Sequence, residues 1–395
     1  MTDPSAAVDQ LAQQLSMVEI ESLSASQLVG RVLAHPILAD RDSPAADVSA
    51  MDGYALRMSD LQRRDPIDVS GESAAGSPPP SMPENHAVRI FTGAIVPAGC
   101  ETIVKREDTQ ELDSKIQLLD SARDLKLGQH IRRAGENAVA GSTVLESGKL
   151  LSAAQLATMA NFGAYDADVF ARVRVTVITT GDEVGLFKDS PPEAWQLRNS
   201  NQVSVRSVLS PHPWIDARDN QHAKDDRDVL LATIQTALQN SDAVLLTGGV
   251  SMGDYDFVPD VVQALGGNII FHGLPVRPGK PILGAAMNDG KLIVGLPGNP
   301  VSATIGCHRF ALPLLAKMSG QTPWLPKRST VRLVDAGEKT IPLHWMRLVT
   351  LTDEGVARPV PSKGSGDLVS LGQSTGYVVT PPGQSGEGPW PYFSW

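Results

Sequence analysis

Three polar turns that contain glycine follow three apolar runs in the second half of the chain. The turns are Thr180-Gly-Asp-Glu183, Thr247-Gly-Gly-Val-Ser-Met-Gly-Asp-Tyr-Asp256 and Gly295-Leu-Pro-Gly-Asn-Pro300. Glycines let a backbone approach a phosphate closely, and consecutive N–H groups form an anion-binding concavity. Carboxylates repel a nearby phosphate unless a cation lies between them, and Mg²⁺ binds oxygen ligands of both kinds. The pattern therefore indicates an anionic substrate that is held together with a divalent cation.

Each of these turns also has an ordinary structural explanation. The loop with Asp254 and Asp256 could be a tight turn with solvated aspartates, and the turn at Glu183 could simply cap a helix. Asn299 and Pro300 form a cap and first-turn pair that suits any helix start. Each turn taken alone can be explained as an ordinary turn or as part of a binding site. If all three turns lie at the same edge of one sheet, a binding site is favoured.

Two further segments suit an anionic ligand. Arg277-Pro-Gly-Lys-Pro281 presents two cations on a proline-stiffened loop, although a solvated basic turn has the same composition. Ser49-Ala-Met-Asp-Gly-Tyr54 contains an Asp-Gly pair, and most such pairs are simply turns. Neither segment identifies a site by itself.

The turns follow segments that predict parallel strands. The runs at 175–179, 242–246 and 292–294 are short and β-rich, and helical patterns follow them. Parallel strands of this kind are buried on both faces, and ligands bind beyond their carboxyl ends. Helices are predicted at 225–238, 259–267 and 299–318. This half of the chain is therefore predicted to form a doubly wound α/β domain with right-handed crossovers.

The flanking segments predict smaller β structures. Strands of one small sheet are predicted at 87–91, 101–105 and 115–119. The loop-like stretch 71–85 is either an interdomain linker or, as we favour, a surface loop within this β-rich domain.

The two ends of the chain also show local patterns. After Pro326 the helical patterns vanish, and the strands of a small all-β domain are predicted at 330–334, 346–351, 376–380 and 390–395. Near the N-terminus, Ser24 is predicted to cap a short helix at 25–29, and a strand follows at 31–33.

Composition excludes several classes of partner. The 395 residues are 42% hydrophobic, which suits more than one domain, and the formal net charge is −10. No dense run of Lys or Arg suggests a nucleic acid, and no stretch approaches the roughly 20 apolar residues of a membrane span. The N-terminus lacks the basic and apolar regions of a signal peptide, and Cys100 and Cys307 lie far apart. The eight histidines have no metal-ligand spacing. We expect a cytoplasmic protein without disulfides, zinc, nucleic-acid partner or membrane span.

Taken together, the ordered motifs resemble the molybdopterin molybdenumtransferase family, which includes the E domain of gephyrin. The resemblance runs through nearly the whole chain. Its most specific pieces are Ser49-Ala-Met-Asp-Gly-Tyr-Ala55, Phe91-Thr-Gly-Ala94 with Pro97 and Gly99, Gly135-Glu136, Thr180-Gly-Asp-Glu183, Gly248-Gly-Val-Ser-Met-Gly253 with Asp256, Pro278-Gly-Lys-Pro281 and Leu296-Pro-Gly-Asn-Pro-Val-Ser-Ala303. Gly364-Ser-Gly-Asp-Leu368 fits the last domain of the family.

The resemblance implies a multidomain fold of the α/β plus β class. It places an elongated N-terminal dimerisation domain at 1–51 and 133–173, with a β-rich domain inserted at 52–132. A doubly wound molybdopterin-binding domain follows at 174–325 and a small C-terminal β-barrel at 326–395. It also implies a homodimer whose site lies between the α/β domain of one subunit and the inserted domain of the other.

The activity that the resemblance implies is the final step of molybdenum cofactor synthesis. Adenylylated molybdopterin and molybdate react with Mg²⁺ to give the cofactor and AMP. Carried over by position, the catalytic residues are Asp52, Thr92, Glu183, Asp225 and Asp256. Glu183, Asp225 and Asp256 are also the expected metal ligands, and Asp226 takes the place of Asp225 in a slightly shifted alignment. The expected substrate-binding residues are Gly248, Gly249, Ser251, Arg277, Lys280, Pro297, Asn299 and Pro300. A molybdopterin adenylyltransferase or a molybdoenzyme chaperone is an expected further partner.

Two positions depart from the family pattern. Asn137 stands where many relatives have aspartate, so it retains an oxygen ligand and loses a charge. Arg277 stands where lysine is usual, which keeps the charge and changes its geometry to a planar fork. We expect these changes to alter metal affinity or rate and to leave the reaction the same.

Two other functions compete with this interpretation. An adenylyltransferase acting one step earlier shares the α/β domain, but it normally lacks the motif at 49–55 and the C-terminal β domain. A non-catalytic scaffold that binds partner peptides has no need of Asp52, Glu183 or Asp256. The presence of these features favours the molybdenumtransferase.

Overall fold

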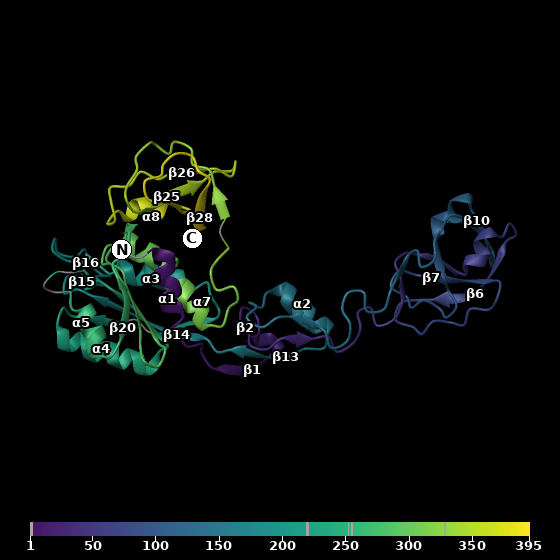
Figure 1. Ribbon diagram of the computed structural model, residues 1–395, viewed down its shortest axis with the longest axis horizontal. Helices are drawn as coiled ribbons and strands as arrows, with labels where there is room; N and C mark the ends of the chain where they lie inside the picture. Colours follow the sequence, from purple (N-terminus) through teal and green to yellow (C-terminus); the bar gives the residue numbers. More distant parts are fainter. Residues whose placement is uncertain (1–2, 219–220, 252, 254–255, 328) are drawn as a thin grey trace. The chain divides into compact units, whose positions relative to one another are not determined.

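The computed structural model describes residues 3–218, 221–251, 253, 256–327 and 329–395 (Figure 1). Contacts along the chain divide it into two compact units. Unit 1 comprises Met1–His35, Ser147–Leu156 and Tyr165–Trp395, and unit 2 comprises Pro36–Glu146 and Ala157–Ala164. The division into four domains stays a prediction.

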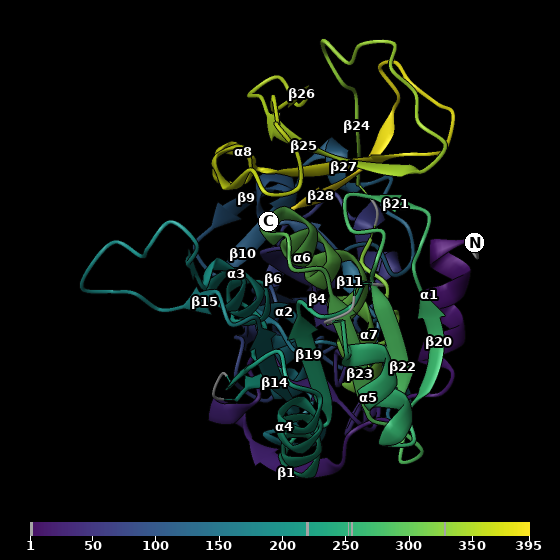
Figure 2. The ribbon, with the colours of Figure 1, turned by 90° about the vertical axis from the view of Figure 1, so that its left-hand side faces the viewer.

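The centre of unit 1 is the predicted parallel sheet. Strands β14 (Val173–Thr180), β19 (Ala243–Thr247) and β23 (Leu292–Leu296) lie side by side in parallel, and β19 and β23 are buried along their whole length (Figure 2). Beside them, β17 (Ile215–Ala217) and β18 (Gln221–Ala223) pair with β14. The sequence did not predict β22 (Leu283–Ala286) and β20 (Asn268–His272), which continue the sheet in antiparallel pairing.

Helices connect these strands, and the sequence predicted all of them except the one at 200–209. They are α3 (Ser200–Leu209), α4 (Arg227–Asn240), α5 (Val258–Ala264), α6 (Pro300–Gly306) and α7 (Leu312–Met318). The α4 helix begins after Asp226, whose carboxylate accepts hydrogen bonds from the N–H groups of Asp228 and Val229. The predicted helix from 299 to 318 is confirmed, with a π-helical turn at Cys307–Ala311 between α6 and α7.

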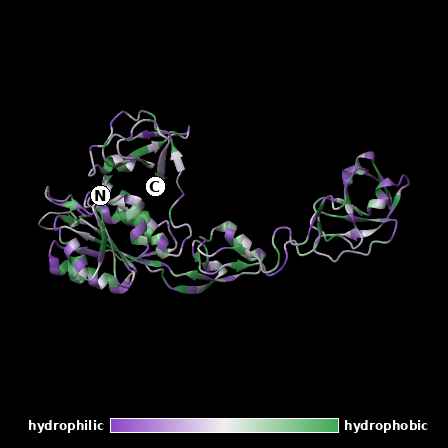
Figure 3. Ribbon diagram, in the orientation of Figure 1, coloured by the Kyte–Doolittle hydropathy of each residue, from purple (hydrophilic) through white to green (hydrophobic). Residues whose placement is uncertain are grey.

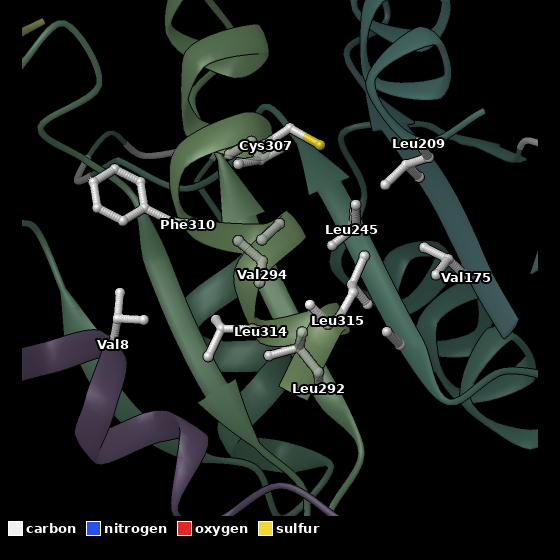
Figure 4. Close-up of a cluster of buried hydrophobic side chains, with 14 of the residues drawn as sticks. Val8, Val175, Leu209, Leu245, Leu292, Val294, Cys307, Phe310, Leu314 and Leu315 are labelled. Atoms are coloured by element: carbon white, nitrogen blue, oxygen red, sulfur yellow. The ribbon is translucent and has the colours of Figure 1, made fainter. Parts of the chain in front are cut away.

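Apolar side chains from several elements meet around this sheet. In Figure 3 its strands are largely green, whereas α4 and α5 carry both colours. Figure 4 shows Val8, Val175, Leu245 and Leu315 in one cluster, and all four are buried. Full burial of such a side chain stabilises a fold by about 1.5–3 kcal/mol. This core therefore fixes the strands whose ends carry the polar turns.

A second helix of this core that was not predicted lies near the N-terminus. Helix α1 (Pro4–Ala12) begins after Asp3, whose carboxylate accepts from the N–H groups of Ser5 and Ala6. The predicted helix at 25–29 is wrong, since the structure has only a 3₁₀ turn at Ala25–Gln27. The predicted strand at 31–33 corresponds to β2 (Val32–Leu33), which joins β1 (Ile20–Ser24) and β13 (Asp166–Phe170) in a small sheet.

The predicted C-terminal β structure is present in unit 1. Its sheet contains β24 (Ser329–Val331), β25 (His344–Leu351), β26 (Ala357–Pro359), β27 (Gly376–Thr380) and β28 (Trp390–Ser394). The expectation that helices vanish after Pro326 is wrong: α8 (Leu368–Gln373) forms because the carboxylate of Asp367 caps it through the N–H of Ser370. Strand β21 (Val276–Arg277) precedes the domain in sequence and pairs with β25.

Unit 2 contains the predicted small sheet. Its strands are β5 (Gly53–Leu56), β6 (Ile67–Ser73), β7 (His86–Ile90), β8 (Thr102–Lys105), β9 (Thr109–Leu112) and β10 (Lys115–Leu118). Because β6 and β7 are neighbours in this sheet, residues 74–85 form a loop within the unit and not a linker, and residues 71–73 of the predicted loop belong to β6. The short pairs are β3 (Ile37–Leu38) with β12 (Thr143–Leu145), and β4 (Val48–Ser49) with β11 (Ile131–Arg132).

The remaining elements are short. Helix α2 (Ala153–Asn161) crosses from one unit to the other in sequence, and β15 (Val184–Gly185) pairs with β16 (Leu197–Arg198) in unit 1. Further 3₁₀ turns are Met58–Gln62, Arg106–Asp108 and Asp120–Ala122. Among the helices of the described residues, none has the length and apolar character to cross a bilayer.

Burial of His308 in the π-helical turn predicts a loss of stability in acid. Burial lowers the pKa of His308 to about 4, helped by the charges of His212 and Arg309, and Tyr377 is its 3.0 Å hydrogen-bond partner. The folded-state pKa lies below the unfolded value of about 6.5, so the unfolded chain binds the proton more tightly. The stabilisation is present above pH 6.5 and is lost as the pH falls toward 4, by roughly 3 kcal/mol at most.

Denaturant unfolding at several pH values measures this effect. The difference between the wild type and His308→Gln, which keeps a polar partner for Tyr377, should shrink between pH 6.5 and 4 as the wild type loses its advantage. A constant difference across that range would contradict the assignment to His308.

Candidate functional site

A cleft of about 870 Å³ opens at the carboxyl ends of β14, β19 and β23. The strand register aligns Thr179 with Thr247 and Thr247 with Leu296, so the three following turns begin at one edge. The predicted site residues that line the cleft are Glu183, Asp225, Gly248, Gly249, Ser251, Asp256, Pro297, Asn299 and Pro300. The expectation that the three turns meet at one edge of the sheet is confirmed.

Glycine is required where the second turn leaves its strand. Gly248 and Gly249 have φ values of 93° and 64°, in the region that favours glycine. A Cβ atom on Gly248 would lie 2.5 Å from the hydroxyl oxygen of Thr180. The Gly248 N–H donates to the carbonyl of Leu296 at 3.1 Å, so this amide joins two turns and is not free for a phosphate.

The carboxylates of the cleft lie on different turns. Asp225 is half-buried and accepts from the N–H of Asp182 at 3.4 Å. Burial raises the pKa of Asp225, and the negative charges of Glu183 and Asp182 raise it further. Asp225 lines the cleft, whereas its neighbour Asp226 caps α4. Burial is thus the main cause of the raised pKa, and the neighbouring carboxylates are the second.

Asp256 is held by its own turn. Its carboxylate accepts from the N–H of Gly253 at 2.7 Å, and its backbone N–H donates to the carbonyl of Gly253 at 3.0 Å. Asp254, which the sequence pattern also singled out, lies outside the described residues. In the described part of the chain, no group of three His, Cys, Asp or Glu side chains is arranged to hold a metal ion. Since Mg²⁺ is usually bound by one or two carboxylates together with substrate phosphates, this donor set fits an ion that arrives with its substrate.

One cation lining this cleft was not predicted. Arg198 donates to the carbonyls of Phe187 at 3.2 Å and Ser190 at 3.3 Å, so it orders the loop between β15 and β16. It lies beyond the Pro191-Pro192 pair in a loop without a recognisable binding motif, which explains why the sequence did not reveal it.

A second cavity of about 960 Å³ adjoins the cleft. Pro281, Pro297 and Asn299 line both, so they form a common wall. The second cavity contains the predicted residues Arg277 and Lys280, together with Arg347, Arg358 and Lys363 from the C-terminal part of unit 1. The one acidic residue among its described lining residues is Asp335, whose carboxylate lies 3.7 Å from the Arg358 guanidinium. The cleft is therefore acidic and the adjoining cavity basic.

Three of these basic residues were missed because their sequence context is uninformative. Arg347 stands between the apolar residues Met346 and Leu348 in a strand, and a charged residue in such an alternation normally faces solvent. Instead it is half-buried, which lowers its pKa, and it donates to the carbonyl of Ala336 at 2.7 Å. Arg347 lines the cavity because β25 pairs with β21, and no local sequence motif predicts that pairing.

Asp52 and Thr92 meet in unit 2. The N–H and hydroxyl of Thr92 donate to one carboxylate oxygen of Asp52 at 2.7 and 2.8 Å. These two hydrogen bonds, the backbone one first, hold the pKa of Asp52 below its usual range, and Arg89 and Arg106 add to the effect. Two predicted functional residues that are 40 positions apart in sequence thus form a hydrogen-bonded pair on the exposed surface.

Asn137 also lies in unit 2. Its side-chain oxygen accepts from Arg132 at 2.9 Å, and Arg132 also forms an ion pair with Glu136 at 2.5 Å. The amide therefore occupies a position where an aspartate would give Arg132 a second carboxylate partner.

Comparisons with known proteins agree with these features. The model of the MoeA N-terminal region (domain I and II) matches residues 3–163, and that of a probable molybdopterin binding domain matches residues 176–317. The molybdopterin molybdenumtransferase of Synechococcus elongatus is 34% identical, over 96% of this chain and 95% of the relative. That of Staphylococcus aureus is 30% identical, over 96% and 91%. A solved structure of the molybdopterin biosynthesis moeA protein from Pyrococcus horikoshii has a TM-score of 0.83 at 25% identity and covers both chains completely.

Substitution of Gly248 tests the geometry of the turn. Gly248→Ala should lower the stability of the chain by about 1–3 kcal/mol, because the new Cβ meets the Thr180 hydroxyl and the φ angle is unfavourable. Gly298→Ala is the matched control in the same cleft, since its Cβ would be 3.7 Å from the nearest atom, Cα of Gly248. Thermal unfolding of the two variants measures the contrast, and equal melting temperatures would contradict the crowding at Gly248.

Proposed function

The chain belongs to the molybdopterin molybdenumtransferase family, and from this we infer that it inserts molybdate during molybdenum cofactor biosynthesis. We propose further that the substrate is adenylylated molybdopterin, that AMP is released and that the reaction needs Mg²⁺. The observation that carries the proposal is the pair of adjoining cavities with opposite charge. A phosphate with its cation suits the acidic cleft, and a free oxyanion suits the basic cavity.

The acidic cleft supplies the proposed cation site. Two like charges at about 4 Å repel by about 4 kcal/mol at an effective dielectric of 20, so a phosphate beside Asp256 and Asp225 needs a counter-ion. Asp256, with Glu183 or Asp225, would hold Mg²⁺ together with a substrate phosphate. The bound ion would stabilise the negative charge that develops on the phosphate as AMP leaves.

The substrate-binding residues would orient the other end of the substrate. Gly248, Gly249, Ser251 and Pro300 line the cleft, and Pro297 and Asn299 belong to the wall that it shares with the basic cavity. A pterin held against this wall would have its reacting sulfur atoms near the oxyanion. Orientation of two bound reactants of this kind lowers a barrier by several kcal/mol.

The basic cavity would bind molybdate. Arg277 is the last residue of β21 and Lys280 lies on the loop that follows, and both line the cavity that Arg347 also lines. A guanidinium binds a tetrahedral oxyanion through two parallel N–H groups, whereas an ammonium acts as a point charge. Arg277 in place of lysine is therefore compatible with oxyanion binding.

We propose no covalent enzyme intermediate. Burial raises the pKa of Cys100 to about 11 and that of Cys307 to about 12. Neither thiol is a nucleophile near neutral pH, because the thiolate is the reactive form. Positioning and charge stabilisation are the contributions that the site offers.

We also propose a homodimer in which Asp52 and Thr92 of one subunit complete the site of the other. Their hydrogen-bonded pair is exposed, and Asp52 is ionised over the physiological range because its pKa is lowered. The free thiols suit a reducing cytoplasm, where a molybdopterin adenylyltransferase and a molybdoenzyme chaperone are the proposed partners.

An AMP-release assay tests the reaction. Adenylylated molybdopterin with Mg²⁺ should release AMP only when molybdate is added, and the product should activate an apo-molybdoenzyme. Asp256→Asn should lower this rate at least tenfold, about 1.4 kcal/mol, and raise the Mg²⁺ concentration that it needs. Asp260→Asn is the control, because this exposed aspartate lies on α5 outside the cleft.

Each negative outcome has a distinct meaning. AMP release without molybdate would show a hydrolase, and no release by a folded chain that binds substrate would favour the scaffold function. Full activity of Asp256→Asn would remove Asp256 from the metal site and leave the reaction itself in place.

Complementation tests the shared site. Asp52→Ala and Asp256→Ala should each be inactive, but subunit exchange between them should restore about a quarter of wild-type activity, because half of the dimers then carry one intact site. Activity of exchanged mixtures, with unmixed variants as controls, measures this. Mixtures that exchange subunits and stay inactive would place both aspartates of each site in a single chain.

A further inference from the structure

The basic cavity gathers cations without matching carboxylates. Arg277, Lys280, Arg347 and Lys363 line it, and none of them forms an ion pair with a carboxylate in the described part of the chain. Asp335, the acidic lining residue, instead lies beside Arg358. Like charges repel one another, so other contacts must hold these side chains toward the cavity.

The ring of Trp345 supplies that contact. The guanidinium carbon of Arg347 lies 4.7 Å from the ring centroid, and that of Arg277 lies 6.0 Å away. The Lys339 ammonium is a third cation, at 5.9 Å. An indole face attracts cations more strongly than the other aromatic rings, because its quadrupole is negative there. Trp345 also lines the cavity itself.

Strand pairing fixes these partners in place. Strands β21 and β25 pair in parallel, and Arg277 lies opposite Trp345 in the register. Arg347 follows Trp345 by two positions on β25, so both side chains point to the same face of the strand. The N–H of His344 donates to the carbonyl of Pro275 at 2.8 Å and closes this junction. Trp345 is thus held between the two arginines by backbone geometry.

We propose that Trp345 is a positioning residue for oxyanion capture: its ring holds Arg277 and Arg347 at the basic cavity without neutralising them. A carboxylate at this position would also hold the arginines, but it would cancel the charge that attracts the oxyanion. This inference rests on the proposed function, in which the cavity receives molybdate. It adds a residue that contributes no charge or hydrogen bond to that step.

The contact with the Trp345 ring also gives a physical reason for arginine, instead of lysine, at position 277. A planar guanidinium stacks on an aromatic face, whereas an ammonium is a compact and strongly hydrated charge. Arg277 therefore depends on Trp345 more than a lysine would. The two residues should act as a coupled pair.

Molybdate binding by Trp345→Leu and Trp345→Phe tests the proposal. Trp345→Leu should raise the Kd and the KM for molybdate by about 3- to 30-fold, the range that one or two cation–π contacts give. Trp345→Phe should show a smaller rise, because its ring retains a weaker negative face. The kcat at saturating molybdate and the KM for adenylylated molybdopterin should stay within about twofold of wild type.

Two further variants serve as controls. Trp390→Phe lies in the same sheet, and no described cation lies over the Trp390 ring, so it should leave the molybdate KM unchanged. In an Arg277→Lys background, Trp345→Leu should raise the KM by a smaller factor than in the wild type, as coupled residues require. Thermal melts establish that each variant is folded.

The outcomes separate this inference from the function on which it rests. A wild type that shows no molybdate-dependent AMP release would overturn the proposed function. A molybdate-dependent wild type with unchanged Kd and KM in folded Trp345→Phe and Trp345→Leu would overturn the role of Trp345 alone. Equal losses in kcat and in both KM values would show a general structural role and also contradict positioning.

Discussion

The parallel register of β14, β19 and β23 is the constraint on which the site depends. Because the three strands end at one edge, the turns that follow them meet although they come from distant parts of the chain. The core beneath the sheet is buried and closely packed, so the strands have little freedom to shift. The Gly248 amide then ties its turn to Leu296 on the next strand. The positions of the cleft residues follow from this packing more than from contacts among themselves.

The acidic cleft and the basic cavity carry opposite charge on the two sides of the wall that they share. Carboxylates on the turns make the cleft acidic, whereas the C-terminal domain brings Arg347 and Lys363 to the other side of Pro297 and Asn299. A single cavity with both sets would favour internal ion pairs, which neutralise the groups that a phosphate, a metal and an oxyanion need. Separation by stiff backbone keeps both sets available and adjacent.

Local patterns predicted much of this arrangement, and non-local contacts account for what they missed. Strands β14, β19 and β23 and the helix from 299 to 318 were predicted because period and capping are local signals, whereas the short parallel strands β17 and β18 were not predicted. Helix α1 was missed because its nine residues give only a short pattern, and what holds it in place is packing against distant strands. Arg347 and Trp345 were missed for a similar reason, since their environment is created by pairing of β25 with β21. Asp226, in contrast, is locally indistinguishable from Asp225 until the helix cap is seen.

The two departures from the family pattern, Asn137 and Arg277, differ in their physical effect. Asn137 still accepts a hydrogen bond from Arg132, so the exchange removes a charge and keeps the contact. Arg277 lies opposite Trp345 in a strand pair, a position where a planar cation gains more than a point charge. The first change removes a charge from a polar cluster in unit 2 and keeps its hydrogen bond, whereas the second places a planar cation beside an aromatic ring. Arginine in place of lysine at 277 looks conservative in sequence, but the residue opposite it on the neighbouring strand makes the two side chains differ in their contacts.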